Sequence, residues 1–335
     1  MKILIMRFMG LGDVASILLP AVKLIKQQTP DAEVDVLTFG AGIELMQMVP
    51  QVHAVLGVTQ EQWPGDLLPA VQSFVGIGEV VLAQGYDRVI NLDTWFMPCF
   101  LARLLKDVGV AVEGNYINTP IAEFTQRLTS NQLTQAYFMG TNFLASSYRD
   151  MADWSSPWWL RPENSVSYPH FYLNHCCGLA GELDFSLPVT LDAEFKAAAQ
   201  GKPIIALSAT GSARNKQYPR VEQLTQLLEQ AGYLVWSQFD GSLPMATTLA
   251  RLKATDLLVT VATSTQWLAR VVGCPSLMIS GSMPPSVLGA ELNVPRLTDC
   301  QYCGQNECQS GLDFACLDVA PSLILQHVQH YLATQ

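Results

Sequence analysis

The first 24 residues constrain the fold of this chain more than any other stretch. A short apolar run, Lys2–Arg7, is followed by the turn Gly10-Leu11-Gly12, and from Asp13 onward apolar residues recur at the spacing of one helix face. An apolar run of this length is typical of a strand that is buried on both faces of a sheet. The stretch therefore predicts a strand, a glycine turn and a helix, the unit from which parallel sheets are built.

The turn after this strand is a candidate ligand site, because ligands of open α/β sheets bind beyond the carboxyl ends of the strands. Asp13 lies at this point. It can be a functional carboxylate, or it can simply be the N-cap of the helix, since Asp is a favoured N-cap residue. The turn lacks the third glycine of a dinucleotide-binding fingerprint, so the pattern alone is weak evidence for a bound cofactor.

The alternation of strand and helix continues through most of the chain. Further strands are expected at Glu33–Phe39, Val52–Val58, Asp87–Leu92, Gly109–Val112, Pro203–Ser208, Tyr233–Ser237, Asp256–Val261 and Ser276–Ser280. Further helices are expected at Ala41–Met48, Leu67–Gln84, Phe96–Lys106, Arg220–Gln230, Met245–Lys253, Thr265–Val272 and Pro321–Ala333. This pattern predicts an α/β fold with mainly parallel sheets, in which a first domain at residues 1–185 faces a second at 186–335 across a cleft.

The composition excludes several classes of function. Hydrophobic residues make up 49% of the 335-residue chain and charged residues only 14%, which indicates a well-buried globular protein. The net charge of −10 argues against nucleic acid as a partner and against strong attraction to an anionic membrane. No apolar run approaches the roughly 20 residues that span a bilayer, and the chain opens on a strand rather than a signal peptide. We expect a cytoplasmic protein with at most peripheral membrane contact.

Four of the eight cysteines lie close together, at Cys300, Cys303, Cys308 and Cys316. In a reducing compartment such a cluster indicates a metal site before disulfides. Four thiolates suit a tetrahedral Zn or Fe ion, and a closed site of this kind would order the loop 300–316 rather than take part in chemistry. The seven-residue gap before Cys316 is unusual for a metal clamp, so free cysteines in a loop are the alternative.

Four blocks of the sequence resemble glycosyltransferase family 9, the ADP-heptose heptosyltransferases. The opening block contains the family's R-x-x-x-[LM]-GD-[VI], LPA and P-[DG]-A-x-[IV]-D patterns. The other blocks are SATGSARNKQYP, DLLVTVATSTQWLARVVGCP with its ISGSMPP tail, and the cysteine segment, while residues 45–200 agree only as an alternating framework. The matching positions of the opening block are Arg7, Gly12, Asp13, Leu19, Pro20, Ala21, Pro30, Ala32 and Asp35.

The resemblance implies a GT-B architecture, with two facing Rossmann-like domains. It implies inverting transfer of heptose from ADP-heptose without a catalytic divalent metal, with the acceptor on the first domain and the donor on the second. Asp13 would be the general base toward the acceptor hydroxyl. Lys216, in K-Q-Y-P where the family has K-x-W-P, would neutralise charge on the departing ADP. The alternative for Lys216 is a solvated surface lysine.

Six further residues are candidate cofactor-binding positions. Backbone N–H groups and hydroxyls in the glycine loop, and N–H groups at the start of the helix near residue 264, can bind phosphate. The candidates are Gly12, Gly211, Ser212, Thr263, Ser264 and Trp267. The family usually has Asp-Ser-Gly or Asp-Thr-Gly followed by histidine, where this chain has Ala262-Thr263-Ser264 and Trp267. The change removes a sugar or ribose acceptor and a phosphate contact, which leaves three explanations open: another sugar donor, another branch of the family, or an inactive enzyme.

Three functions are therefore in competition. The resemblance favours transfer of heptose to a lipopolysaccharide inner core. The block STQWLARVVGCPSLMISG is closer to the branch that transfers heptose to autotransporter proteins and has an iron-bearing cysteine finger, which makes protein O-heptosylation the first alternative. A catalytically silent binding or scaffold protein on the same fold is the second. The sequence is compatible with an oligomer.

Overall fold

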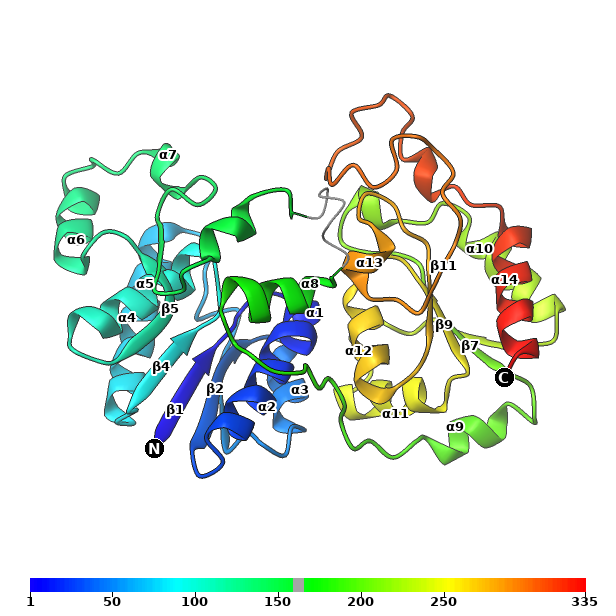
Figure 1. The fold of residues 1–335 in the computed structure, drawn as a ribbon, viewed down its shortest axis with the longest axis horizontal. Coiled ribbons are helices and arrows are strands. Elements are labelled where there is room, and N and C mark those ends of the chain that lie inside the picture. The colour runs from blue at the N-terminus through cyan, green and yellow to red at the C-terminus, as the bar shows by residue number, and fades with distance from the viewer. Residues whose placement is uncertain (159–165) are drawn as a thin grey trace. The chain divides into compact units, whose positions relative to one another are not determined.

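The structure, a computed structural model, describes residues 1–158 and 166–335. The chain divides into two compact units (Figure 1). The first consists of Met1–Ser156 and Pro169–Asp184, and the second of Pro157–Tyr168 and Phe185–Gln335. In each unit helices surround one sheet, as the alternation of strand and helix predicted.

The sheet of the first unit has six strands in the order β3-β2-β1-β4-β5-β6. All are parallel except β6, which pairs with β5 in antiparallel direction. The chain moves from β1 to β2 in one direction and places β4 on the other side of β1. This reversal is the switch point at which open α/β sheets bind ligands. The strands are β1 (Lys2–Met6), β2 (Glu33–Phe39), β3 (Ala54–Val58), β4 (Arg88–Asn91), β5 (Val112–Ile117) and β6 (Leu144–Ser146).

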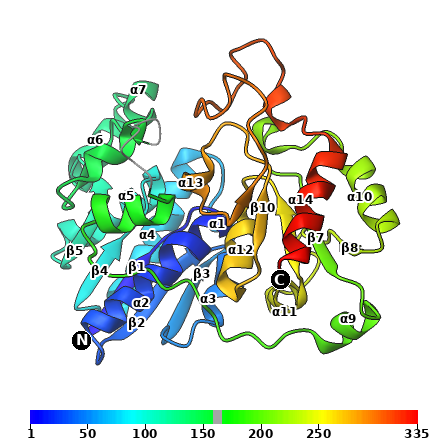
Figure 2. The ribbon, with the colours of Figure 1, turned by 45° about the vertical axis from the view of Figure 1, so that its right-hand side comes forward.

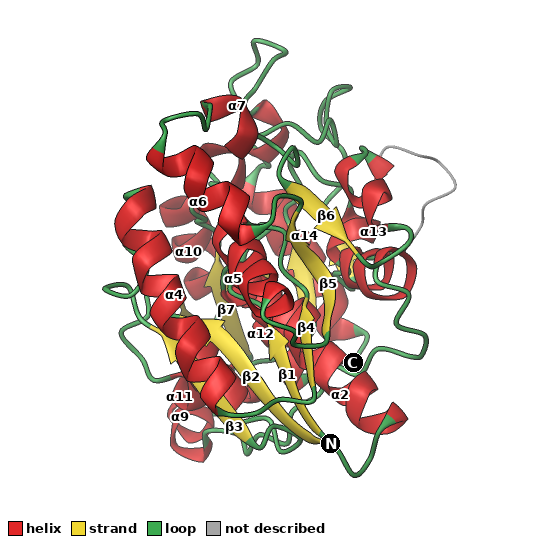
Figure 3. Cartoon of the chain, turned by 90° about the vertical axis from the view of Figure 1, so that its left-hand side faces the viewer, coloured by secondary structure: helices red, strands yellow, loops and turns green. Residues whose placement is uncertain are grey.

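The helices of the first unit cover both faces of this sheet. The main core lies between the sheet and the helices α4 and α5, which Figure 3 shows lying over the strands. One long helical run follows β1 and contains a π-helical stretch, a feature that is frequent at functional sites. The elements are α1 (Leu11–Asp13), π-helical η1 (Val14–Leu18), α2 (Leu19–Gln28), α3 (Gly42–Gln47), α4 (Leu67–Ala83), α5 (Phe96–Asp107), α6 (Ile121–Thr129), α7 (Gln135–Phe138), η2 (Met151–Ser155), α8 (Tyr168–His170) and η4 (Phe171–Cys176).

The second unit contains an all-parallel sheet in the order β11-β10-β9-β7-β8. Its switch point lies between β7 and β9, because β8 flanks β7 on the opposite side. Figures 1 and 2 show α14 beside α10. The strands are β7 (Ile204–Ser208), β8 (Leu234–Trp236), β9 (Leu257–Thr260), β10 (Ser276–Met278) and β11 (Leu292–Asn293). The helices are α9 (Ala193–Ala198), η5 (Arg214–Lys216), α10 (Val221–Gln230), α11 (Met245–Ala254), α12 (Ser264–Val272), α13 (Pro285–Leu288), η6 (Ala315–Leu317) and α14 (Pro321–Ala333).

Several expected element boundaries differ from those of the structure. The strand expected at Gly109–Val112 begins where that prediction ended, because Gly109 adopts a φ of 94° in the turn that leads into β5. The helix expected from Asp13 begins at Leu11. Among the described residues, no helix combines the length and the hydropathy that a membrane crossing needs.

Candidate functional site

Asp13 lies at the switch point of the first unit and forms an ion pair with Arg7. The Arg7 side chain follows β1 and is only 1% exposed, and its Nη2 donates to Asp13 Oδ1 at 2.8 Å. Its Nη1 donates to the carbonyl oxygen of Leu92, and the guanidinium lies 5.1 Å from the ring centre of Tyr172. A buried guanidinium needs a counter-ion, so Asp13 has a partner that fixes the orientation of its carboxylate.

The alternative role of Asp13 as a helix N-cap is wrong. Gly10 is the residue that precedes the helix, and Asp13 lies inside the first turn, where its N–H donates to Gly10 O at 2.8 Å. Its carboxylate makes no cap hydrogen bond. Gly12, a predicted cofactor-binding residue, lies in the same turn and is partly exposed. The hypothesis that this turn is functional therefore rests on the Asp13 carboxylate, which is held by Arg7 and is partly exposed to solvent.

Asp93 is a site residue that the sequence analysis missed. It follows β4, the other strand of the switch point, and is fully buried. Its Oδ2 accepts hydrogen bonds from the N–H groups of Phe8 at 2.6 Å and Met9 at 3.2 Å, and its Oδ1 accepts from Trp95 N–H at 3.2 Å. Asp93 thus fixes the segment that leads into the Asp13 turn. The sequence feature that could have identified Asp93 is a single carboxylate directly after a strongly apolar strand.

The second unit brings four of the predicted donor-site residues together at its own switch point: Gly211, Lys216, Thr263 and Ser264. The loop after β7 folds back on itself, with Gly211 N–H donating to Lys216 O at 2.7 Å. A Cβ atom on Gly211 would lie 2.7 Å from Lys216 Cβ and 3.2 Å from Thr263 Cγ2. Only glycine therefore lets the loop approach both residues this closely.

Thr263 and Ser264 form the start of α12. Thr263 is the N-cap residue, yet its hydroxyl makes no cap hydrogen bond and instead lies 3.3 Å from Thr260 Oγ1. A helix N-terminus has a partial positive charge and N–H groups without partners inside the helix. Lys216 adds a full positive charge beside it, and in the described part of the chain it forms no ion pair. The arrangement is suited to an anion such as a phosphate.

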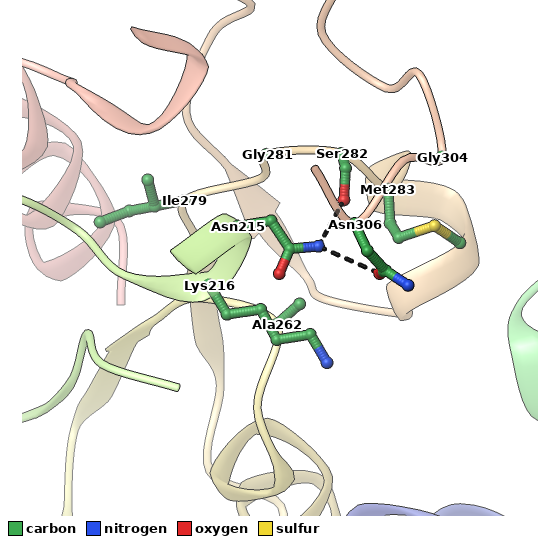
Figure 4. Close-up of a pocket in the computed structure, with 9 residues that line it drawn as sticks. All are labelled: Asn215, Lys216, Ala262, Ile279, Gly281, Ser282, Met283, Gly304 and Asn306. Carbon is green, nitrogen blue, oxygen red and sulfur yellow. Dashed lines mark hydrogen bonds between the residues drawn. The ribbon is translucent and has the colours of Figure 1, made fainter. Parts of the chain in front are cut away.

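A cavity of about 230 Å³ opens beside Lys216 (Figure 4). Its walls include Asn215 and Ala262 from the two loops at the switch point, and Gly304 and Asn306 from the cysteine-rich loop. The cysteine-rich loop therefore contributes to the same site as Lys216, a connection that no motif in the sequence indicated.

The other two predicted donor-site residues lie at the edge of this arrangement. Ser212 is exposed in the loop next to Gly211. Trp267 is buried, and its ring stacks on Phe185 with centroids 6.3 Å apart and meets Tyr168 at 6.3 Å. Its described contacts are packing contacts within the second unit, behind the helix start. Tyr218, which stands at the family's tryptophan position, is also buried and donates from its hydroxyl to Val319 O at 2.7 Å.

The cysteine cluster contains a thiol with a lowered pKa, but the sulfur atoms are not arranged as in a metal site. The Sγ atoms of Cys300 and Cys308 lie 3.4 Å and 3.3 Å from the Ser310 hydroxyl. The Phe314 N–H and the Ser310 hydroxyl lower the pKa of Cys308 to about 7. Throughout the described residues, one set of three or more potential ligand atoms lies within 4.8 Å of one another, and it contains no cysteine. In the described chain, no three of the four sulfurs lie within 4.8 Å of one another.

That one set, Glu33, Asp35 and His53, lies at the start of the strands, away from the switch point. Asp35 already has partners: its Oδ2 accepts from the Tyr86 hydroxyl at 2.7 Å and lies 3.7 Å from Lys2 Nζ. His53 Nδ1 lies 2.9 Å from Asp35 Oδ1. Lys2, His53 and Tyr86 thus already contact these carboxylates at the beginning of the sheet.

Known proteins with similar sequences or folds include glycosyltransferases. No protein-family model matches the chain. Lipopolysaccharide heptosyltransferase 3 of Escherichia coli is 29% identical over 87 residues, which is 26% of this chain and 25% of that protein. The match thus spans a quarter of the length of the curated relative.

Two solved structures cover nearly the whole chain. A glycosyl transferase family 9 protein from Veillonella parvula DSM 2008 has a TM-score of 0.68 at 14% identity, over 100% of this chain and 98% of its own. TibC of enterotoxigenic E. coli H10407, a dodecameric iron-containing heptosyltransferase solved with ADP-D-beta-D-heptose, has a TM-score of 0.60 at 10% identity, over 99% of this chain and 76% of its own. The two solved structures therefore share the fold of this chain.

These similarities agree with the resemblance to glycosyltransferase family 9 that the sequence blocks carried. The GT-B class of fold is confirmed as well, with two parallel-sheet domains of the kind found in the family's solved structures. At identities this low a structural likeness shows the fold alone. The reaction has to be argued from the residues of the two switch points.

The lowered pKa of Cys308 predicts an unusually reactive thiol. Because the thiolate is the nucleophile, its alkylation by iodoacetamide in protein freed of any bound metal should rise with pH through a midpoint of about 7 and level off above it. Cys274, whose pKa burial raises to about 12, should stay unmodified. Mass spectrometry of digested protein would measure both rates, with Cys308→Ser as the control. A midpoint near the ordinary thiol value of about 8.5 would contradict the prediction.

Proposed function

We propose that this protein is an inverting glycosyltransferase that transfers heptose from ADP-heptose to a lipopolysaccharide inner-core acceptor. The observation that carries the proposal is the convergence of Gly211, Lys216 and Thr263 on the N-terminus of α12. This is an anion site at a switch point, which suits the diphosphate of a nucleotide sugar. The match to a heptosyltransferase and the likeness to a structure solved with ADP-heptose support the choice of donor.

In the proposed reaction Lys216 and the helix N-terminus neutralise the leaving group. As the bond between the anomeric carbon and the diphosphate oxygen breaks, negative charge grows on ADP. An ammonium group and preorganised N–H groups stabilise that charge without any rearrangement at the moment of reaction. Catalysis independent of a divalent metal is part of the proposal, because Lys216 and α12 supply the positive charge.

Asp13 is the proposed general base. It takes the proton from the acceptor hydroxyl while that oxygen forms a bond to the anomeric carbon from the face opposite ADP. The configuration at the anomeric carbon is thereby inverted. The hydrogen bond from Arg7 to one carboxylate oxygen orients the base, and Asp93 holds the chain segment before it. General bases of this kind contribute about 100- to 10,000-fold to a rate.

A protein acceptor is the second candidate. The sequence block from Ser264 to Gly281 and the likeness to TibC favour it. Purified protein incubated with ADP-heptose and either a heptose-deficient lipopolysaccharide core or an autotransporter passenger domain would separate the two acceptors. If heptose is transferred to neither acceptor while nucleotide binding is intact, the protein would instead be the catalytically silent binding protein suggested by Ala262 at the family's Asp position. We further propose a cytoplasmic location with at most peripheral membrane contact, and an oligomeric assembly.

Asp13→Asn should abolish transfer and spare donor binding. The amide keeps the size of the side chain and an oxygen that Arg7 can reach, but it cannot take a proton. We expect the rate to fall by about 100-fold or more, and ADP affinity, measured by calorimetry, to stay within about twofold because the proposed donor site lies in the other unit.

Asp184→Asn is the matched control for this variant, since that carboxylate forms a partly exposed ion pair with Lys23 and has no proposed role. Near-normal transfer by Asp13→Asn would contradict the proposed base. Asp13→Ala is a poorer test, because it leaves the buried Arg7 guanidinium without its counter-ion and lowers stability as well.

Lys216→Gln should weaken ADP binding. Loss of a charge-assisted hydrogen bond to phosphate corresponds to about a 10- to 100-fold higher Kd. The salt dependence of binding should also become shallower, because one charge fewer contacts the diphosphate. Titration calorimetry at two salt concentrations would measure both effects. Lys202→Gln, at an exposed lysine, is the control. Equal affinity of Lys216→Gln and the wild-type protein would rule out the phosphate role.

We also propose that Cys300, Cys303, Cys308 and Cys316 bind one structural Fe or Zn ion. The donor set and the iron of TibC support this, although the present sulfur positions do not fit a metal, so the loop would have to rearrange around it. Elemental analysis should find about one metal ion per chain, and Cys303→Ser should lose it while Cys274→Ser keeps it. Metal-free protein with four freely titrating thiols in the loop would contradict the proposal.

A further inference from the structure

The side-chain amide of Asn215 is held in one orientation at the wall of the cavity. Asn215 is 5% exposed, and its Nδ2 lies 3.3 Å from Ser282 Oγ, 3.4 Å from Gln305 O and 3.3 Å from Asn306 Oδ1. A backbone carbonyl such as that of Gln305 can only accept, so the nitrogen of Asn215 has to face it. Figure 4 shows the amide oxygen directed away from Ser282 and Asn306, on the side of Lys216.

The amide oxygen is a buried acceptor that lacks a donor. Among the described residues, none lies within hydrogen-bond distance of Asn215 Oδ1. Native proteins leave few buried polar atoms in this state, because each one has lost its water without a replacement. A donor supplied by a bound ligand accounts for an acceptor that is both fixed in orientation and unpaired.

The rest of the cavity wall indicates what kind of ligand this is. Ala262, Ile279 and Met283 are apolar, and Lys216 supplies a positive charge. The lining residues in the described chain include neither a carboxylate, which would repel an anion, nor an aromatic ring, on which a base would stack. Such a cavity suits a hydroxylated, non-aromatic group attached to a phosphate, which is a description of a sugar.

We propose that Asn215 Oδ1 accepts a hydrogen bond from a hydroxyl of one of the two sugars that flank the diphosphate of the donor. The inference rests on the proposed function, since it assumes that Lys216 holds that diphosphate. Asn215 then determines specificity: a fixed, buried acceptor disfavours a sugar that lacks the hydroxyl, because the oxygen stays unpaired. The contacts from Gln305 and Asn306 make the cysteine-rich loop the element that sets the orientation of the amide.

Calorimetry on the folded, full-length protein can test this and identify the sugar. The probes are ADP, 2′-deoxy-ADP, 3′-deoxy-ADP and ADP-heptose, each titrated into wild-type protein and Asn215→Ala. If a ribose hydroxyl is bound, Asn215→Ala weakens ADP by about tenfold, and one deoxy analogue binds both proteins equally. If the transferred sugar is bound, ADP changes less than about twofold while ADP-heptose weakens by about tenfold. Either pattern supports the proposal.

Two results would overturn it. One is a loss of affinity that is the same for every probe, which means that Asn215 only supports the loop, and the other is no loss for any probe. Ser282→Ala is the control, because it removes a partner of the nitrogen and leaves the oxygen in place. If Asn215→Ala does not fold, Asn215→Ser gives the same comparison. Wild-type protein that binds neither ADP nor ADP-heptose would instead refute the proposed function, and this inference with it.

Discussion

The buried guanidinium of Arg7 is the constraint on which the first unit depends. A charge that is 1% exposed needs polar partners, and the contacts of this one include the Asp13 carboxylate, the carbonyl of Leu92, and the ring and hydroxyl of Tyr172. Those groups come from the first helical turn, the end of β4 and the π-helical segment η4. One side chain thus ties together the parts of the first unit that surround its switch point, and the proposed base is one of its partners.

The second unit also has a switch point, but the charges around it differ from those in the first unit. Its switch point contains no buried ion pair of this kind among the described residues. Instead Lys216 and the start of α12 place positive charge side by side, and Gly211 permits the close approach. An anionic ligand at this point would be stabilised by both sources of positive charge. The two switch points therefore differ: one orients a carboxylate, and the other presents positive charge.

The sequence predicted the framework better than the site. Apolar runs such as that of β7 mark a strand buried on both faces without help from other residues, so most elements were found. Asp93 and Asn215 were missed because their roles depend on partners 85 and 90 residues away along the chain, which no local pattern encodes. The alternative that Asp13 caps its helix fails because the helix begins two residues earlier, after Gly10.

The position of the cysteine-rich loop indicates a role that the spacing of its cysteines did not. Tyr302 N–H donates to Gly281 O at 3.1 Å and Gly304 N–H donates to Ser282 O at 2.7 Å, so the loop is attached to the segment that follows β10. From there it reaches Asn215 and closes one side of the cavity beside Lys216. A loop without regular structure is poorly suited to holding an amide in one orientation unless something orders it. Hydrogen bonds around Ser310 do part of this in the present arrangement, and four thiolates on one ion would do it more firmly. The requirement for an ordered cavity wall is thus a physical reason for the structural metal that we propose in this loop.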